Sequence, residues 1–160
     1  MSNVKDNEIV IWEDKYKTGV ELIDKQHHML VDLTNQLYLA CRAGEDATVA
    51  VFQDAMHKMV EYVRLHFTAE LVFLNRIKYP DYHNHKKMHD DLVLKILDSA
   101  KEFNEGKKLI PNNFVRTLKD WVFGHIAVYD KMYSAYVLDQ KRKGVLTEKI
   151  LKEIEEDIGN

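Results

Sequence analysis

Histidine is the residue type whose placement in this sequence suggests chemistry, since eight histidines occur among 160 residues. Two pairs of potential metal ligands are separated by four positions, namely His66 with Glu70 and His85 with His89. Residues four apart on an α-helix lie on the same face, so each pair can direct two donor groups at one point. This spacing is typical of metal ligands.

Two further histidines, His27 and His125, lie on other apolar stripes, and either one alone could be a hydrogen-bonded core residue. Together, five imidazoles and a carboxylate are costly to bury, because each unsatisfied polar group costs about 1–3 kcal/mol. Bound metal would satisfy them, and imidazole with carboxylate favours iron, manganese or zinc. Five imidazoles exceed what one ion ordinarily takes, so two ions are predicted, and Glu70 could bridge them.

Four long segments with a helical repeat of apolar residues must position these side chains. The repeats cover approximately residues 23–41, 52–73, 85–103 and 114–132. The second must end before Pro80, and Asn112 or Asn113 is the predicted N-cap of the fourth. Helical segments of this length favour an all-α fold, an antiparallel up-down-up-down four-helix bundle with an N-terminal arm. The other three histidines, His28, His57 and His83, are predicted to face solvent or the boundary of the bundle.

A shorter amphipathic stripe at about residues 145–159 predicts a fifth helix, with Thr147 as its N-cap. Its apolar face must be covered by the bundle or by a protein partner, and the sequence leaves both possibilities open. We therefore predict a single domain over residues 1–160, with the bundle at about 12–138 and the C-terminal extension after it.

Composition disfavours several classes of partner. The chain has 23 Lys and Arg against 26 Asp and Glu, a net charge of -3, so no basic surface for nucleic acid or an anionic membrane is expected. No stretch has the length and apolarity of a membrane span, and the first residues lack the apolar core of a signal peptide. The single cysteine, Cys41, allows no intramolecular disulfide. A cytoplasmic location is expected.

Four motifs contain the histidines of the apolar stripes. They are Asp24-Lys25-Gln26-His27, His66-Phe67-Thr68-Ala69-Glu70, Tyr79-Pro80 ahead of His85-Lys86-Lys87-Met88-His89, and Trp121-Val122-Phe123-Gly124-His125 with Asp130 and Tyr133. Together, over about residues 12–136, they resemble the bacterial hemerythrins. The resemblance implies non-enzymatic, reversible binding of dioxygen at two iron ions (Fe²⁺/Fe³⁺) with a bridging oxo or hydroxo group.

The resemblance also implies a ligand set. Its members are His85, His89 and His125 on one iron, His27 and His66 on the other, and Glu70 and Asp130 as bridges. Spacing alone does not indicate Asp130, which lies five residues after His125, about 140° round an ideal α-helix. Asp130 could reach the same centre only from the flank of the stripe or through a local distortion of the helix.

The iron with two histidines would keep an open position for dioxygen, and the resemblance implies a dry apolar wall around it. The residues at those positions are Leu30, Phe67, Trp121, Val122 and Ile126. Apolar residues at helical spacing are also ordinary core, and one residue can serve both roles. The family's usual second acid and methionine after the bridging glutamate are replaced by Leu71 and Leu74, which affects the pocket rather than the ligands.

The sequence disfavours several functions other than oxygen storage, transport or delivery. A ferritin-like di-iron oxidase uses Glu-x-x-His motifs, and a zinc peptidase uses His-Glu-x-x-His, and the sequence contains neither. A phosphotransfer bundle would display one exposed histidine instead of several converging ones. The remaining alternative is an oxygen, nitric oxide or redox sensor or interaction module with the same di-iron site, because the site residues do not separate sensing from storage.

Overall fold

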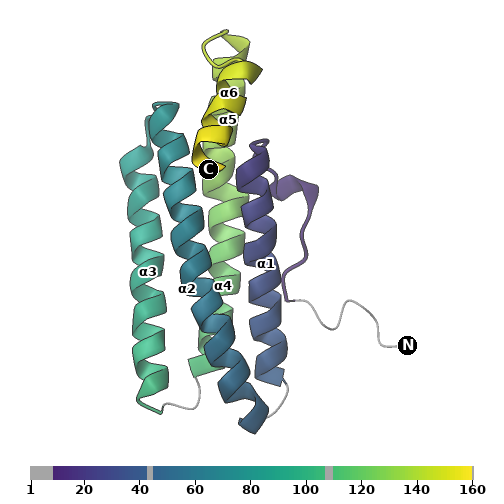
Figure 1. Cartoon of the computed structure of the whole chain (residues 1–160), viewed down its shortest axis with the longest axis vertical. Coiled ribbons are helices and arrows are strands. Elements are labelled where there is room, and N and C mark those ends of the chain that lie inside the picture. Colours follow the sequence, from purple (N-terminus) through teal and green to yellow (C-terminus); the bar gives the residue numbers. More distant parts are fainter. Residues whose placement is uncertain (1–8, 43–44, 107–109, 160) are drawn as a thin grey trace, which may run out of the picture.

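The computed structural model describes residues 9–42, 45–106 and 110–159, and four helices in these ranges form an antiparallel bundle (Figure 1). The helices are α1 (Glu21–Arg42), α2 (Glu45–Arg76), α3 (Tyr82–Asn104) and α4 (Ile110–Gly124). Each helix contacts its neighbours in a ring, α1 with α2, α2 with α3, α3 with α4 and α4 with α1. The predicted all-α, up-down-up-down bundle is confirmed.

The apolar stripes of the helices form two buried clusters. One contains Leu30 and Ile126, and the other contains Ile23 and Tyr133. On α1 the buried polar residue His27 lies between Ile23 and Leu30 in the sequence, and the other long helices show the same interruption. The buried polar side chains therefore separate one apolar cluster from the other.

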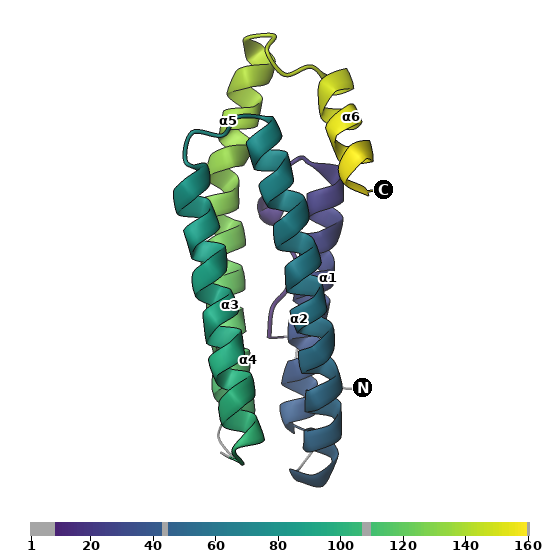
Figure 2. The same cartoon turned by 60° about the vertical axis from the view of Figure 1, so that its left-hand side comes forward.

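The last long helix changes its hydrogen-bond pattern near the middle of its length. α4 ends at Gly124, His125–Asp130 is π-helical, and α5 (Lys131–Arg142) continues in the same direction (Figure 2). A π-helical turn pairs residues five apart instead of four, so His125 and Asp130 come to the same side of the helix. This segment is the local distortion that Asp130 requires in order to reach the centre.

Two expectations about this helix are wrong. α4 begins at Ile110, so Asn112 and Asn113 lie within its first turn instead of capping it. Met132, at the end of the predicted stripe, is 50% exposed. The wider π-helical turn shifts the positions that follow it, and a stripe drawn with a constant α-helical repeat therefore loses register there.

The chain reverses after α5 through a glycine in the left-handed conformation. Gly144 has a φ of 70°, and the Val145 N–H donates to the carbonyl of Gln140 at 3.0 Å, which is the Schellman arrangement. α6 (Glu148–Gly159) then runs back beside α2 and α1 (Figure 2). The hydroxyl of Thr147 accepts the Ile150 N–H at 3.3 Å, so the predicted cap is confirmed.

The apolar face of α6 is covered by the bundle, which was one of the two open possibilities. Leu151 and Ile154 are buried in the cluster that contains Ile23. Oε2 of Glu155 accepts the Leu22 N–H at 3.0 Å and so satisfies a free donor at the start of α1. The extension is thus attached to the end of the bundle by both apolar and polar contacts.

The N-terminal arm lies along α1 (Figure 1). The side-chain oxygen of Asn35 accepts the N–H groups of Ile9 and Val10, each at 3.0 Å, and its amide donates to the carbonyl of Val10 at 2.8 Å. A short 3-10 turn, Asp14–Tyr16, leads from the arm to α1. None of the helices in the described ranges combines the length and apolarity needed to cross a bilayer.

Candidate metal centre

Seven polar side chains meet inside the bundle, although none is more than 2% exposed. α1 provides one, α2 and α3 two each, and the π-helical segment two: His27, His66, Glu70, His85, His89, His125 and Asp130. All seven ligands that the resemblance implies therefore lie in the interior. The other three histidines, His28, His57 and His83, are exposed as expected.

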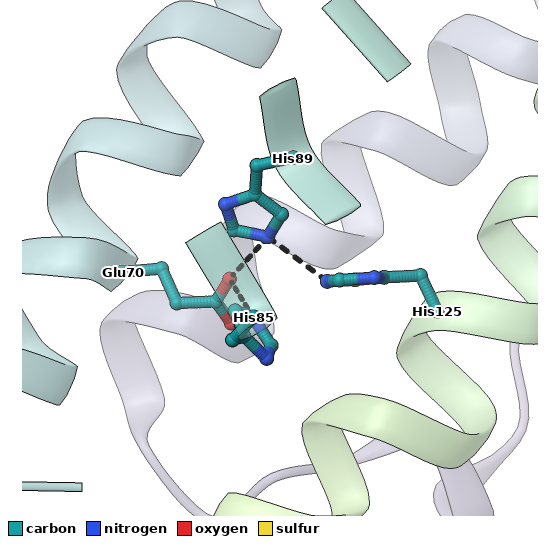
Figure 3. Close-up of side chains that lie close together, drawn as sticks. All are labelled: Glu70, His85, His89 and His125. Atoms are coloured by element: carbon teal, nitrogen blue, oxygen red, sulfur yellow. Dashed lines mark hydrogen bonds and ion pairs between the residues drawn. The ribbon is translucent and has the colours of Figure 1, made fainter. Parts of the chain in front are cut away.

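One group of donor atoms contains Glu70, His85, His89 and His125, all within 4.8 Å of one another (Figure 3). Nε2 of His89 lies 2.9 Å from Nε2 of His125 and 3.1 Å from Oε2 of Glu70. Two donor atoms about 2.1 Å from one ion and at right angles to each other are about 3.0 Å apart. The group therefore has the spacing of neighbouring ligands around one octahedral ion.

A second group contains His27, His66 and Glu70, again within 4.8 Å of one another. Asp130 lies between the two groups, because its Oδ1 is 3.0 Å from Nε2 of His125 and its Oδ2 is 3.2 Å from Nε2 of His27. Glu70 belongs to both groups. The two carboxylates are thus shared between two adjacent sets of imidazoles, which is an arrangement for a pair of ions.

Several of these buried atoms have no hydrogen-bond partner in the described part of the chain. They include Nε2 of His27, Nε2 of His66 and both carboxylate oxygens of Asp130. Each such atom costs about 1–3 kcal/mol when it is buried without a partner. Metal ions would take up these lone pairs, so the donor set fits two ions that prefer imidazole and carboxylate, such as iron.

The carboxylates remain ionised in the metal-free protein. Burial alone would raise the pKa of Glu70, but hydrogen bonds from His85 and His89 hold that pKa well below its ordinary value. Burial and the charge of Glu70 raise the pKa of Asp130, but His125 and His27 outweigh them and lower it to about 2. Both carboxylates therefore offer the charged form that a metal ion binds.

The histidines divide into two kinds. Burial lowers the pKa of His66 to about 3, and it also lowers the pKa of His89. Burial acts in the same direction on His27 and His85, but the nearby carboxylates of Asp130 and Glu70 respectively outweigh it, so these two pKa values are raised. His66 and His89 are thus uncharged, which is the form of histidine that binds metal. His27 and His85 must lose a proton before they can bind metal at acidic pH.

Neighbouring side chains fix the orientation of the imidazoles. Nδ1 of His66 lies 3.1 Å from Oε1 of Gln26, and donating its proton there leaves Nε2 free to bind metal. The ring of Phe67 stacks on His89 with centroids 3.7 Å apart, and Trp121 stacks on His125 at 4.3 Å. Phe67 and Trp121, predicted only as pocket wall, thus also pack flat against two candidate ligands.

The five predicted pocket residues share one apolar region. Leu30, Phe67, Val122 and Ile126 are buried in the same cluster, and Trp121 is partly buried against it. Contact of this region with dioxygen remains a prediction.

Sequence reasoning assigned no role to two residues that touch the site. The hydroxyl of Tyr133 donates to Oε1 of Glu70 at 2.7 Å, and Gln26 accepts from His66 as described above. Gln26 is the residue immediately before His27, so it faces the site only because α1 presents two adjacent positions to the interior. A tyrosine on an apolar stripe is usually core, and its spacing carries no sign of a hydrogen bond to a carboxylate.

Known proteins are similar to this chain over most of its length. Residues 18–137 match the family model "Hemerythrin HHE cation binding domain". The bacteriohemerythrin of Methylococcus capsulatus is 30% identical over 119 residues, which cover 74% of this chain and 88% of that protein. The bacteriohemerythrin of Stenotrophomonas maltophilia is 26% identical over 130 residues, covering 81% and 82% respectively.

Solved structures agree with the sequence matches. A crystal structure of wild-type hemerythrin superimposes with a TM-score of 0.72 at 27% identity and covers 79% of this chain and 96% of that one. A point variant of hemerythrin gives a TM-score of 0.73 at the same identity, covering 80% and 96%. The likeness therefore extends over most of the chain, including the four-helix bundle.

Proposed function

The chain belongs to the hemerythrin family, whose members bind oxygen at a di-iron site, and we propose that it binds dioxygen reversibly for storage, transport or delivery, without enzymatic turnover. The observation that carries the proposal is the sharing of Glu70 and Asp130 between two groups of buried imidazoles. A site for one ion would not require carboxylates that face two groups at once.

In this proposal each group of imidazoles holds one iron ion. The ligands would be His85, His89 and His125 for one ion, His27 and His66 for the other, and Glu70 and Asp130 between them. Two ferrous ions, completed by a bridging oxo or hydroxo group, would supply the electrons for reversible oxygen binding. The protein holds the imidazoles through Gln26 and the stacked rings of Phe67 and Trp121, so the donors are arranged before metal arrives.

The apolar cluster beside the site supports reversibility. Leu30, Val122 and Ile126 are at most 3% exposed, so water is excluded from that side of the imidazoles. Exclusion of water suppresses proton entry and side reactions of reactive oxygen species. We therefore assign these three residues, with Phe67 and Trp121, to the oxygen pocket.

A sensor or interaction module that responds to oxygen, nitric oxide or redox state is the second candidate. One observation favours it: Asp130 is the last residue before α5, α5 leads to α6, and α6 contacts α1 through Glu155. A shift of the π-helical segment could therefore be transmitted to the C-terminal helix and change the binding of a protein partner. Hydrogen exchange of α6 that differs between oxygen-free and oxygen-bound protein would support this role, and identical exchange would exclude it.

The experiment for the oxygen-binding proposal is an anaerobic loading followed by gas cycling. The protein is loaded with ferrous iron, its iron content is measured, and its visible spectrum is recorded as oxygen is admitted and removed. The proposal predicts two irons per chain and a charge-transfer band that appears and disappears over repeated cycles. Irreversible oxidation at the first exposure would contradict it, and absence of bound iron would contradict the ligand assignment as well.

A further inference from the structure

Tyr133 makes a hydrogen bond to the metal-binding cluster that the proposed ligand set does not use. Its side chain is fully buried, and its hydroxyl donates to Oε1 of Glu70 at 2.7 Å. The other carboxylate oxygen, Oε2, lies 3.1 Å from Nε2 of both His85 and His89. The phenol thus occupies one side of the carboxylate and leaves the opposite oxygen to the imidazoles.

The surroundings of Tyr133 hold its hydroxyl in place. The ring packs against Phe73 and Tyr79, with centroids 6.3 Å and 6.2 Å away. Thr18 lies close to this hydroxyl, and its own hydroxyl donates to Oδ1 of Asp24 at 2.8 Å. Burial raises the pKa of Tyr133 well above its ordinary value, so the phenol stays protonated and remains a donor.

The Thr18 segment is itself anchored to the helix that carries Tyr133. The hydroxyl of Ser134, the next residue on α5, donates to the carbonyl of Thr18 at 2.6 Å. The Thr18 N–H donates to Oδ1 of Asp24 at 2.6 Å. These hydrogen bonds, made through Ser134 next to Tyr133, hold α5 against the segment that leads into α1.

We propose that Tyr133 is a positioning residue that orients the shared carboxylate Glu70 and, through its hydrogen bond, weakens that carboxylate as a donor to metal. The inference rests on the proposed function. A hydrogen bond to a carboxylate draws negative charge toward the donor, and negative charge on a ligand favours the ferric over the ferrous ion. Tyr133 therefore stabilises the reduced site and slows its irreversible oxidation.

The test compares Tyr133→Phe with Tyr136→Phe. Tyr136 lies one turn further along α5, and its hydroxyl interacts with the carbonyls of Ile77 and Lys78 instead of the site. Both variants lose one hydroxyl from the same helix. The readouts are the midpoint potential, the rate at which the oxygenated spectrum is lost, and the visible spectrum of Co²⁺ bound to the metal-free protein.

Tyr133→Phe is expected to lower the midpoint potential, to change the Co²⁺ bands and to speed the loss of the oxygenated spectrum by about tenfold, the size of effect that one charge-assisted hydrogen bond can produce. Tyr136→Phe is expected to leave all three readouts near the wild-type values. Equal shifts in both variants, or no shift in Tyr133→Phe, would overturn the proposal.

A second variant covers the case in which Tyr133→Phe does not fold. Tyr133→3-fluorotyrosine keeps the hydroxyl and the shape but makes a stronger donor, so the potential should move upward, opposite to the effect of phenylalanine. No upward shift would contradict the proposal. Wild-type protein without a reversible oxygen band would refute the proposed function instead, and the Co²⁺ spectra would still test the position of Glu70.

Discussion

Replacing Ile154 with alanine tests whether α6 is part of the folded domain. Ile154 is 6% exposed and lies in the apolar cluster with Phe73, whereas Ile150, one turn earlier on α6, is 38% exposed. The same substitution at these two positions changes helix propensity equally, so the difference between them reports burial. Ile150→Ala is therefore the matched control for Ile154→Ala.

The expected magnitudes follow from burial. Removing a buried isoleucine side chain costs about 2–4 kcal/mol, including the cavity that remains. At the partly exposed position the lost burial is smaller, and alanine's higher helix propensity offsets part of it, so a cost below about 1 kcal/mol is expected.

The assay is urea unfolding of the metal-free protein, followed by circular dichroism. We expect a lower urea midpoint for Ile154→Ala with an unchanged slope, and a midpoint near wild type for Ile150→Ala. Equal, small effects of the two substitutions would refute the docking of α6 on the bundle. Oxygen affinity should change less than twofold in either variant, since Ile154 belongs to the other apolar cluster from the predicted oxygen pocket.

Three further predictions concern the site and one turn of the bundle. His89→Ala should lower iron content, whereas His57→Ala should keep it and change unfolding free energy by less than about 0.5 kcal/mol; equal iron content would count against the ligand assignment. Because the pKa values of His27 and His85 are raised, their protonated forms stabilise the metal-free fold below about pH 6.5 and that contribution is lost as pH rises through the folded pKa. Metal must displace these protons when it binds. Co²⁺ affinity measured by titration should therefore fall by up to about tenfold per displaced proton for each pH unit below the folded pKa, and a pH-independent affinity would contradict this. Lys78, two residues after the end of α2, has a φ of 56°, and Lys78→Gly should raise the free energy of unfolding by about 0.5–1 kcal/mol; a lower free energy in urea unfolding would contradict the expected relief of backbone strain.

The bundle could be predicted from the sequence because its signals are local and repeated. Apolar residues at helical spacing mark one face of each helix, and Pro80 and Gly144 mark where helices end. The convergence of His66 with Glu70 and of His85 with His89 was also accessible, because four-residue spacing fixes two donors on one face.

Other features depend on tertiary contacts or on irregular backbone. Asp130 reaches the site through a π-helical turn, which a constant α-helical repeat does not anticipate, and the resemblance to a family was needed to assign it. The hydrogen bond from Tyr133 to Glu70 joins residues 63 positions apart. The covering of α6 by the bundle likewise joins residues distant in sequence, so its apolar face alone left a partner equally possible.

The most direct test of the central claim is a crystal structure of the iron-loaded protein with anomalous scattering recorded at the iron edge. A di-iron centre predicts two anomalous peaks inside the bundle, one beside His85, His89 and His125 and one beside His27 and His66. Glu70 and Asp130 should contact both peaks. A single peak, or two peaks that share neither carboxylate, would contradict the assignment of a di-iron centre.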